Sequence, residues 1–222
     1  MSSRRLIIAI DGPSGAGKGT VARTLSEHLG YRHIDTGAMY RAVAWKALHD
    51  DLSLDDESAI AALATRAHLS VEDGVIAVDG HDVTREIRTP EIDKAAASVA
   101  RLPKVREILV RRQRDEGRDG GVVMEGRDIG TVVFPDADVK VYLDASPEER
   151  ARRRANDPAH TGSRAGQAAV AEAIEARDKS DTTRAVSPLT LAPDAVRIDT
   201  TGMPIPQVVE TVLKLVQKKL TG

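Results

Sequence analysis

The 222-residue chain contains no cysteine, which excludes disulfide bonds, thiolate metal ligands and a cysteine nucleophile. Aromatic residues make up 2% of it, so the stacked rings that bind single-stranded nucleic acid are scarce. The formal net charge of −2 gives no overall basic field to attract a polyanion. The first apolar run, residues 6–10, is too short for a membrane span or a signal-peptide core. We therefore expect a soluble cytoplasmic protein that binds neither nucleic acid nor a membrane.

Short apolar runs alternate with stretches of helical spacing along the chain. Each run ends at polar or glycine residues, as buried strands do. Strands are expected at residues 6–11, 31–34, 121–124, 139–143 and 196–199. Helices are expected at residues 21–29, 36–48, 57–68, 91–100, 103–116, 167–179 and 205–220, with a further one beginning at Ser146. This alternation predicts a single α/β domain over residues 1–222, with a central parallel sheet flanked by helices.

Two segments interrupt the alternation. Within residues 64–94, short alternating runs are broken by Asp73-Gly74 and Asp79-Gly80, dipeptides that favour tight hairpin turns. We therefore expect an inserted subdomain with a small antiparallel sheet. Residues 156–166 are polar and contain proline and glycine, which predicts a mobile loop between two helices.

Residues 12–20 carry the motif Gly12-Pro-Ser-Gly-Ala-Gly-Lys-Gly-Thr20, which fits G-x-x-x-x-G-K. Glycines allow backbone N–H groups to turn inward around phosphate oxygens, and the following helix presents its positive end to the same anion. The alternative is a glycine-rich turn with one solvated lysine, but the strand before it and the helix after it favour a phosphate-binding loop. The residues expected to bind nucleotide phosphates are Gly12, Pro13, Ser14, Gly15, Ala16, Gly17, Lys18, Gly19 and Thr20.

The residue after Lys18 departs from the commonest form of this loop. Gly19 stands where a serine or threonine hydroxyl usually binds Mg²⁺, and Thr20 comes one position later. We expect Thr20 to contact a phosphate and Mg²⁺ to be held by nucleotide oxygens and waters. No residue is therefore assigned as a direct metal ligand, although Asp11 and Asp144 follow strands and are weak candidates.

Charged residues elsewhere in the chain predict an anionic second substrate. The segment Asp35-Thr-Gly-Ala-Met-Tyr-Arg41 places a hydroxyl, an aromatic ring and a guanidinium at a strand-to-helix junction. Gly126-Arg127-Asp128 places a charge pair at the end of another strand. In doubly wound sheets, ligands bind beyond the carboxyl ends of the strands. The Asn-Lys-x-Asp motif of signalling GTPases is absent from the sequence.

Five motifs extend along nearly the whole chain. They are Asp11-Gly-Pro-Ser-Gly-Ala-Gly-Lys-Gly-Thr20, Asp35-Thr-Gly-Ala-Met-Tyr-Arg41, Glu86-Ile-Arg-Thr89, Gly126-Arg-Asp-Ile-Gly-Thr-Val-Val-Phe-Pro135 and Arg184-Ala-Val-Ser-Pro-Leu189. In these motifs the chain resembles the bacterial cytidylate kinases, members of the nucleoside monophosphate kinase family. The resemblance implies a P-loop kinase fold, Mg²⁺-assisted transfer of the γ-phosphate of ATP to CMP or dCMP, and a monomer. It also implies that residues 64–94 form a CMP-binding subdomain and that residues 153–168 form a helical lid.

The same resemblance assigns roles to individual residues. The cytosine would be read by Ser98, Arg106 and Asp128, and the CMP phosphate would be held by Arg41, Arg127 and Arg184. The sugar would be faced by Thr36, Arg177 and Asp181. Tyr40 would pack against the base, and Asp35 would orient Arg41 or the phosphate. Catalysis would involve Lys18, Arg127, Asp128 and Arg184, and Arg154 would contact ATP.

Two other functions stay open. A kinase for another small anion, such as shikimate or another nucleotide, would share the phosphate-binding loop, and a nucleotide-binding switch would bind without turnover. The basic run between Arg150 and Arg154 also has two interpretations. It is either a solvated helix face with local ion pairs or a strip that closes on the ATP phosphates. The preference between CMP and dCMP cannot be determined from the sequence.

Overall fold

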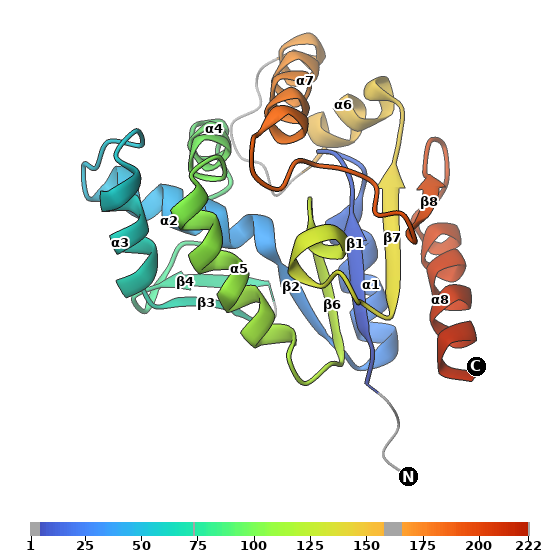
Figure 1. Ribbon diagram of the computed structural model, residues 1–222. Coiled ribbons are helices and arrows are strands. Elements are labelled where there is room, and N and C mark those ends of the chain that lie inside the picture. The colour runs from blue at the N-terminus through green and yellow to red at the C-terminus, as the bar shows by residue number, and fades with distance from the viewer. Residues whose placement is uncertain (1–4, 73, 158–165, 222) are drawn as a thin grey trace.

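The computed structural model describes residues 5–72, 74–157 and 166–221 (Figure 1). In this part of the chain, the main sheet has five parallel strands in the order β2-β6-β1-β7-β8. They are β1 (Ile7–Asp11), β2 (Arg32–Asp35), β6 (Val122–Gly126), β7 (Val139–Asp144) and β8 (Val196–Asp199). The central strand β1 pairs with both β6 and β7, with Ile8 opposite Val123 and Val139. Because the strands run in one direction, their carboxyl ends share one edge of the sheet.

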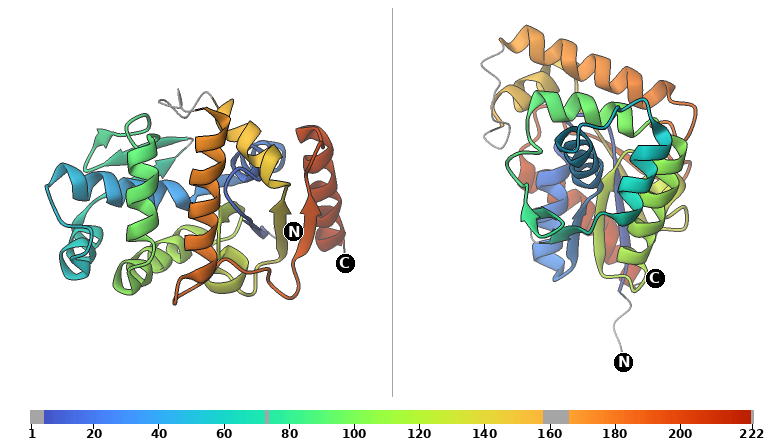
Figure 2. Two further views of the ribbon diagram at one scale, coloured as in Figure 1. Left: turned by 90° about the horizontal axis from the view of Figure 1, so that it is seen from above. Right: turned by 90° about the vertical axis from the view of Figure 1, so that its left-hand side faces the viewer.

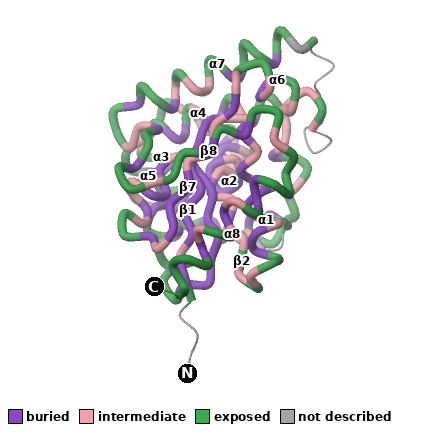
Figure 3. Tube along the Cα trace, turned by 90° about the vertical axis from the view of Figure 1, so that its right-hand side faces the viewer, coloured by how far each residue is buried: buried purple, intermediate pink, exposed green. Residues whose placement is uncertain are grey.

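Helices cover both faces of this sheet (Figure 1). The α-helices of the described residues are α1 (Lys18–Leu29), α2 (Thr36–His49), α3 (Glu57–Arg66), α4 (Pro90–Val99), α5 (Pro103–Gly117), α6 (Pro147–Ala155), α7 (Gln167–Thr183) and α8 (Ile205–Thr221). Successive residues of a strand point to opposite faces. Ile8 and Ile10 pack with α1 and α8, whereas Ala9 packs with Val110 of α5, and β1 and β7 are buried along most of their length (Figure 3). The predicted α/β fold with a central parallel sheet is confirmed.

A second, antiparallel sheet follows α3, as the hairpin dipeptides predict. Its strands, in the order β3-β4-β5, are β3 (Leu69–Glu72), β4 (Val75–Val78) and β5 (His81–Asp82). Asp79 and Gly80 have φ angles of 51° and 81°, the left-handed conformation that a two-residue hairpin turn requires. Ile76 and Val78 are buried in a core shared with α2, α3 and α4. The small sheet is therefore packed on the main domain (Figure 2).

The helices α6 and α7 pack against each other beyond the carboxyl edge of the main sheet (Figures 1 and 2). Ala151, Val170 and Ile174 form a small apolar cluster between them. Residues 158–165, which make up most of the expected loop and half of the expected lid, lie outside the described residues. None of the described helices is long and apolar enough to cross a membrane.

Helix α7 continues to Thr183, four residues beyond its expected end. The extension has no apolar periodicity to reveal it. It is supported instead by an ion pair between Arg177 and Asp181, one turn apart, and by the hydroxyl of Thr183, which donates to the carbonyl oxygen of Lys179. The consequence is that Asp181 lies on a helix.

The sequence gives no sign of the π-helical turn Ile129–Val133 that follows β6. Its cause is a contact between distant segments. The carboxylate of Asp11, at the end of β1, accepts hydrogen bonds from the backbone N–H groups of Ile129 at 2.8 Å and Gly130 at 2.7 Å. This turn fixes the positions of Arg127 and Asp128, which lie between β6 and the bonded N–H groups.

Candidate active site

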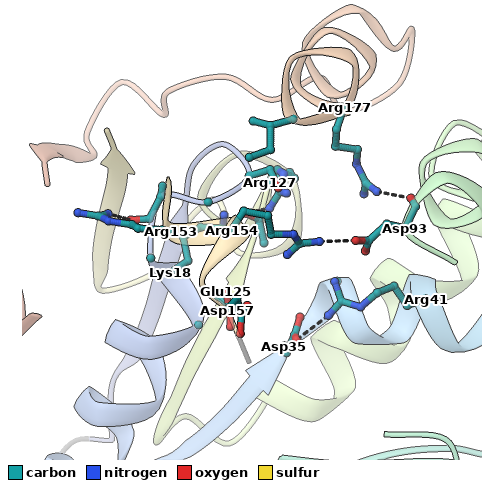
Figure 4. Close-up of a pocket in the computed structure, with 18 of the residues that line it drawn as sticks. Lys18, Asp35, Arg41, Asp93, Glu125, Arg127, Arg153, Arg154, Asp157 and Arg177 are labelled. Carbon is teal, nitrogen blue, oxygen red and sulfur yellow. Dashed lines mark hydrogen bonds and ion pairs between the residues drawn. The ribbon is translucent and has the colours of Figure 1, made fainter. Parts of the chain in front are cut away.

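A cavity of about 1310 Å³ opens at the carboxyl edge of the main sheet. The glycine-rich loop and the start of α1 line one side of it, residues of α2, α4 and α5 line the other, and α6 and α7 lie above (Figure 4). A site for one small ligand usually measures roughly 300–1,000 Å³. This cavity therefore has room for two substrates side by side.

The loop between β1 and α1 contains positions that favour or require glycine, among them Gly12 and Gly17. Gly12 has a φ of 148°, and a Cβ atom there would lie 2.0 Å from the carbonyl oxygen of Leu143. Gly17, with a φ of 89°, is the N-cap of α1. Residues 14–20 line the cavity, whereas Gly12 and Pro13 are not among its lining residues. The free N–H groups of the first turn of α1 thus lie beside the cavity, as an anion site requires.

Lys18 is buried, and its Nζ donates a 2.8 Å hydrogen bond to the carbonyl oxygen of Pro13. Burial, together with the positive charge of Arg127, lowers the pKa of Lys18 to about 7, and the carboxylate of Glu125 partly opposes this shift. A phosphate in the loop would raise the pKa again, because a nearby negative charge favours the ammonium form. Protonation of Lys18 and anion binding are therefore linked.

Two arginines of α6 hold the loop by its backbone. Arg150 donates to the carbonyl oxygen of Ser14 at 3.0 Å and forms an ion pair with Asp178 of α7. Asp178 in turn accepts from the N–H of Ser14 at 3.1 Å. Arg153 donates to the carbonyl oxygen of Ala16 at 3.3 Å. Neither interpretation of the basic run anticipates this role, which fixes the loop to the helices above it.

The other two arginines of the run behave differently. Arg152 is exposed, as expected of a solvated helix face, and it pairs with Glu149 of the same helix, whose side chain is 13% exposed. Arg154, predicted to contact ATP, extends from α6 to an ion pair with Asp93 of α4 (Figure 4). Arg177 of α7 donates to the carbonyl oxygen of the same residue at 2.8 Å. Helix α4 is thereby joined to both helices above the sheet.

The junction between β2 and α2 holds three predicted site residues. Asp35 caps α2 by accepting from the N–H of Ala38 at 2.9 Å, and it forms a 2.8 Å ion pair with Arg41. Burial acts to raise the pKa of Asp35, but Arg41 and the capping hydrogen bond outweigh it and leave the pKa below its ordinary value. Asp35 thus contacts the guanidinium of Arg41 directly, as its predicted role of orienting Arg41 requires. The hydroxyl of Thr36 donates to the carbonyl oxygen of Glu125 at 2.7 Å and so joins β2 to β6.

Asp181 lies among three of the predicted arginines. Arg127 donates to it at 2.9 Å, Arg177 donates to it at 3.3 Å, and Arg184 lies 3.8 Å away. Burial acts to raise the pKa of Asp181, but the three guanidinium groups outweigh it and hold the pKa below its ordinary value. The carboxylate therefore brings Arg127 and Arg184, two predicted phosphate ligands, into one place.

Arg106 and Asp128 form a buried ion pair in the wall of the cavity. Arg184 lies 3.6 Å from Asp128, and the guanidinium of Arg106 lies 5.5 Å from the centre of the Tyr40 ring. Burial raises the pKa of Tyr40 to about 12, so its phenol keeps its proton. Within the described residues, Nε of Arg106 and one terminal nitrogen of Arg184 are buried without a hydrogen-bond partner. This wall offers donors and an acceptor to a planar polar ligand.

Ser98, the third predicted cytosine contact, lies on α4 and lines the same cavity as that buried pair. It is exposed on α4, although it lines the rim of the cavity. Residues four apart share a helix face. Asp93 and Ala97 line the cavity from one face of α4, and Lys94 and Ser98, which are also four apart, line it beside them.

Glu125 and His33 line the cavity but were not singled out from the sequence. Glu125 is the next-to-last residue of β6, and Nε2 of His33, on β2, lies 3.1 Å from its Oε1. Burial acts to lower the pKa of His33, but the hydrogen bond and the charge of Glu125 outweigh it and raise the pKa. The sequence does contain one indication that Glu125 belongs to a site, because it is a carboxylate in an otherwise apolar strand. The sequence contains no such indication for His33, because its contact with Glu125 depends on how β2 pairs with β6.

The two weak candidates for a metal ligand are already engaged. Burial raises the pKa of Asp11 to about 6 although both of its oxygens accept backbone hydrogen bonds. Asp144 accepts from the N–H of Ala145 at 2.9 Å and pairs with Arg197 at 2.7 Å. In residues 5–72, 74–157 and 166–221, no group of three or more His, Cys, Asp or Glu side chains is arranged to hold a metal.

Solved structures share the fold at low sequence identity. Shikimate kinase from Acinetobacter baumannii, in complex with shikimate, has a TM-score of 0.50 and 15% identity, covering 97% of this chain and 95% of that one. The protein TT1252 from Thermus thermophilus has a TM-score of 0.50 and 20% identity, covering 99% and 100%. These likenesses concern the fold alone, and they confirm the predicted P-loop kinase fold.

Sequence comparison is more specific. The family model described as Cytidylate kinase matches residues 8–218. The chain is 51% identical to the cytidylate kinase of Pelotomaculum thermopropionicum over 93% of each protein. It is 47% identical to that of Desulfitobacterium hafniense over 98% of this chain and 95% of that one, and 48% identical to that of Shewanella frigidimarina over 100% and 99%. The resemblance carried by the five motifs thus extends over the whole length of these proteins, and the chain belongs to the cytidylate kinase family.

Proposed function

We propose that this protein transfers the γ-phosphate of ATP to CMP and dCMP, giving ADP and CDP or dCDP. The observation that carries the proposal is one cavity that joins a phosphate-binding loop to a separate wall of arginines and carboxylates. Membership of the cytidylate kinase family supports the same reaction. Mg²⁺ that arrives with ATP would neutralise charge that develops on the phosphates during transfer.

The donor half of the site is the loop at residues 12–20. Its backbone N–H groups and the ammonium of Lys18 bind the ATP phosphates. Arg154, which lines the cavity from α6 and pairs with Asp93 of α4, is the further residue proposed to contact ATP. Supporting contacts from Arg150 and Arg153 hold the loop in shape, so little reorganisation is needed when the nucleotide binds.

The acceptor phosphate is bound by Arg41, Arg127 and Arg184. Two unit charges about 4 Å apart repel by roughly 4 kcal/mol at an effective dielectric near 20, and guanidinium groups offset this repulsion as the two phosphates approach. They bind phosphate oxygens in pairs, which a lysine ammonium does not. Asp35 and Asp181 hold these arginines in place before the substrate arrives. Phosphoryl transfer depends mainly on such positioning and charge stabilisation.

The cytosine is read by Asp128 and Arg106, beside Tyr40. The carboxylate accepts from the exocyclic N4 amine, and a guanidinium donates to the N3 and O2 acceptors. Uracil presents O4 where cytosine has the amine, so a carboxylate there meets a second acceptor, at a cost of about 1–3 kcal/mol. The remaining proposed contacts, to the sugar and to the rim of the base, are Thr36, Arg177, Asp181 and Ser98.

A coupled assay of ADP release, with ATP and Mg²⁺ as the donor, tests the reaction on CMP, dCMP, UMP, AMP, GMP, dTMP and shikimate. We expect CMP and dCMP to have the highest kcat/KM, with UMP lower by roughly ten- to a hundredfold. A clear preference for UMP, AMP or shikimate would contradict the assignment of the base contacts. Nucleotide binding without turnover on any acceptor would favour a regulatory protein instead.

The proposal includes a cytoplasmic monomer in which residues 64–94 act as a CMP-binding subdomain and residues 153–168 as a lid. Val71 and Ile76 of the small sheet line the cavity, which supports a role for the insert. The described part of a single chain supplies both halves of the cavity, which supports a monomer. Light scattering at the enzyme concentration used for the assay checks this, and a stable dimer would contradict it.

A further inference from the structure

The space beside the loop residue Gly19 is occupied by a carboxylate. A Cβ atom built on Gly19 would lie 3.1 Å from Oε1 of Glu125 and 3.7 Å from its Oε2. In the commonest form of the loop, a serine or threonine at this position uses its hydroxyl to bind the magnesium of the nucleotide. The chain therefore lacks the hydroxyl and has an acidic oxygen within van der Waals distance of where it would begin.

Glu125 is held at this place from several sides. Its side chain is 10% exposed and projects from β6 into the cavity lining, beside Lys18 and Arg127, whose pKa values its charge raises (Figure 4). Nε2 of His33, on β2, donates to Oε1 at 3.1 Å. Burial of a carboxylate lowers the stability of a protein unless the charge is paired, and a negative charge also repels nucleotide phosphates. A functional role would explain why Glu125 lies at this position.

The other carboxylates at the ends of the main-sheet strands have other partners or lie outside the cavity. Asp35, which ends β2 and lines the cavity, caps α2 through the N–H of Ala38 and pairs with Arg41. Both oxygens of Asp11 accept backbone hydrogen bonds from the π-helical turn. Asp144 is occupied by Ala145 and Arg197, and it is not among the cavity-lining residues. Among these carboxylates, Glu125 is the one that lies against the phosphate-binding loop, next to Gly19.

We propose that Glu125 takes the place of the missing loop hydroxyl as the protein's contact to the Mg²⁺ of the donor nucleotide, directly or through a water, and that His33 is the positioning residue for it. Carboxylate and water oxygens are the ligands that Mg²⁺ prefers, and one or two carboxylates with nucleotide phosphates commonly complete its site. A histidine that binds such a carboxylate from behind fixes its orientation, as outer partners do at other metal sites. The inference rests on the proposed function for its donor, a magnesium-bound nucleotide.

The test measures nucleotide and magnesium binding without an acceptor. Calorimetric titration of ADP in EDTA and in excess Mg²⁺ gives the factor by which magnesium tightens binding. Glu125→Gln should reduce this factor about tenfold or more, whereas ADP in EDTA should bind at least as tightly as before, because a negative charge beside the phosphates is gone. Glu125→Asp, which keeps the charge on a shorter side chain, should retain part of the factor. Asp144→Asn, which removes a strand-end charge outside the cavity, is the matched control and should leave the factor unchanged.

A second pair of variants tests the positioning role. His33→Gln keeps a donor near the place of Nε2 and should preserve the magnesium factor to within about threefold, whereas His33→Leu should reduce it by about tenfold. An undiminished factor in Glu125→Gln would overturn the assignment of the carboxylate. Equal weakening of ADP binding with and without Mg²⁺ would also overturn it, since Glu125 would then only balance the charges of Lys18 and Arg127. Equal factors in the two His33 variants would overturn the positioning role. Because no acceptor is present, these outcomes are independent of whether CMP proves to be the substrate.

Discussion

Asp128→Asn replaces the carboxylate proposed to read cytosine by an amide of nearly the same shape. In the structure this carboxylate is buried, paired with Arg106 and 3.6 Å from Arg184. The amide offers an N–H donor, so O4 of uracil finds a partner where it would meet a carboxylate. Removing one buried mismatch is worth about 1–3 kcal/mol. Since 1.36 kcal/mol is tenfold in rate, the ratio of kcat/KM for CMP to that for UMP should fall roughly ten- to a hundredfold.

Initial rates with both acceptors at saturating ATP give this ratio, and calorimetry gives the affinity for ADP, which should stay within about twofold of the original. Thermal unfolding is followed in parallel, because leaving a buried guanidinium without its carboxylate destabilises a protein by up to about 3–5 kcal/mol. Asp119→Asn is the matched control. Asp119 is exposed and is not among the residues that line the cavity, so this variant should leave the ratio unchanged. A folded Asp128→Asn protein with an unaltered CMP-to-UMP ratio would refute the reasoning. Parallel losses of turnover and of ADP affinity would also refute it, since Asp128 would then support the fold and not the base.

Binding of ADP at pH 8 should take up close to one proton, because the pKa of Lys18 is about 7 in the free protein and a phosphate raises it; titrations in buffers of different ionisation enthalpy measure the uptake, and Lys18→Met should abolish it. Because of the same lowered pKa, the unfolded chain binds more protons at Lys18 than the folded protein does between pH 7 and 10.5. The free energy of unfolding contributed by this group should therefore increase as the pH rises through that window, and Lys18→Met should lack this increase. Gly12→Ala should lower the free energy of unfolding by more than about 3 kcal/mol, because its methyl group would lie 2.0 Å from a carbonyl oxygen, whereas Gly30→Ala, with φ of 63° and open space, should cost about 1–2 kcal/mol; similar urea midpoints for the two would contradict this. Asp181→Asn should raise KM for CMP about tenfold with little change in KM for ATP, because its arginine partners lose the charge that gathers them; equal increases in both constants would exclude that role.

Local patterns predicted most of the fold because the responsible chemistry is local. The strand that ends at Asp11 and the helix that begins after the glycines follow from apolar runs and a loop motif. Ser146 shows the same: its hydroxyl accepts from the N–H of Glu149 at 3.2 Å, the cap that the sequence indicates. The hairpin at Asp79-Gly80 likewise forms because of the two residues in it.

The parts that sequence reasoning missed depend on contacts between distant segments. His33 and Glu125 are 92 positions apart, and they meet because β2 pairs with β6 in one particular register. The π-helical turn after β6 exists because Asp11 binds it from another strand. The family motifs brought Arg41, Arg127 and Arg184 to one cavity correctly, although their roles stay predictions. The role of Ser98 also stays a prediction, since this residue lines the cavity but is exposed on α4.

Asp11 links the segment that leads into the phosphate-binding loop to the segment that contains Arg127 and Asp128. It is the last residue of β1, directly before the phosphate-binding loop, and its two oxygens accept hydrogen bonds from the turn that follows Arg127 and Asp128. One buried carboxylate in the middle of the sheet therefore fixes the distance between the phosphate-binding loop and the segment with Arg127, while α2 and α7 position the other two arginines. Alterations to the walls of the cavity, in α4 or in the small sheet, would change which acceptor fits while leaving the alignment of the reacting groups as it is.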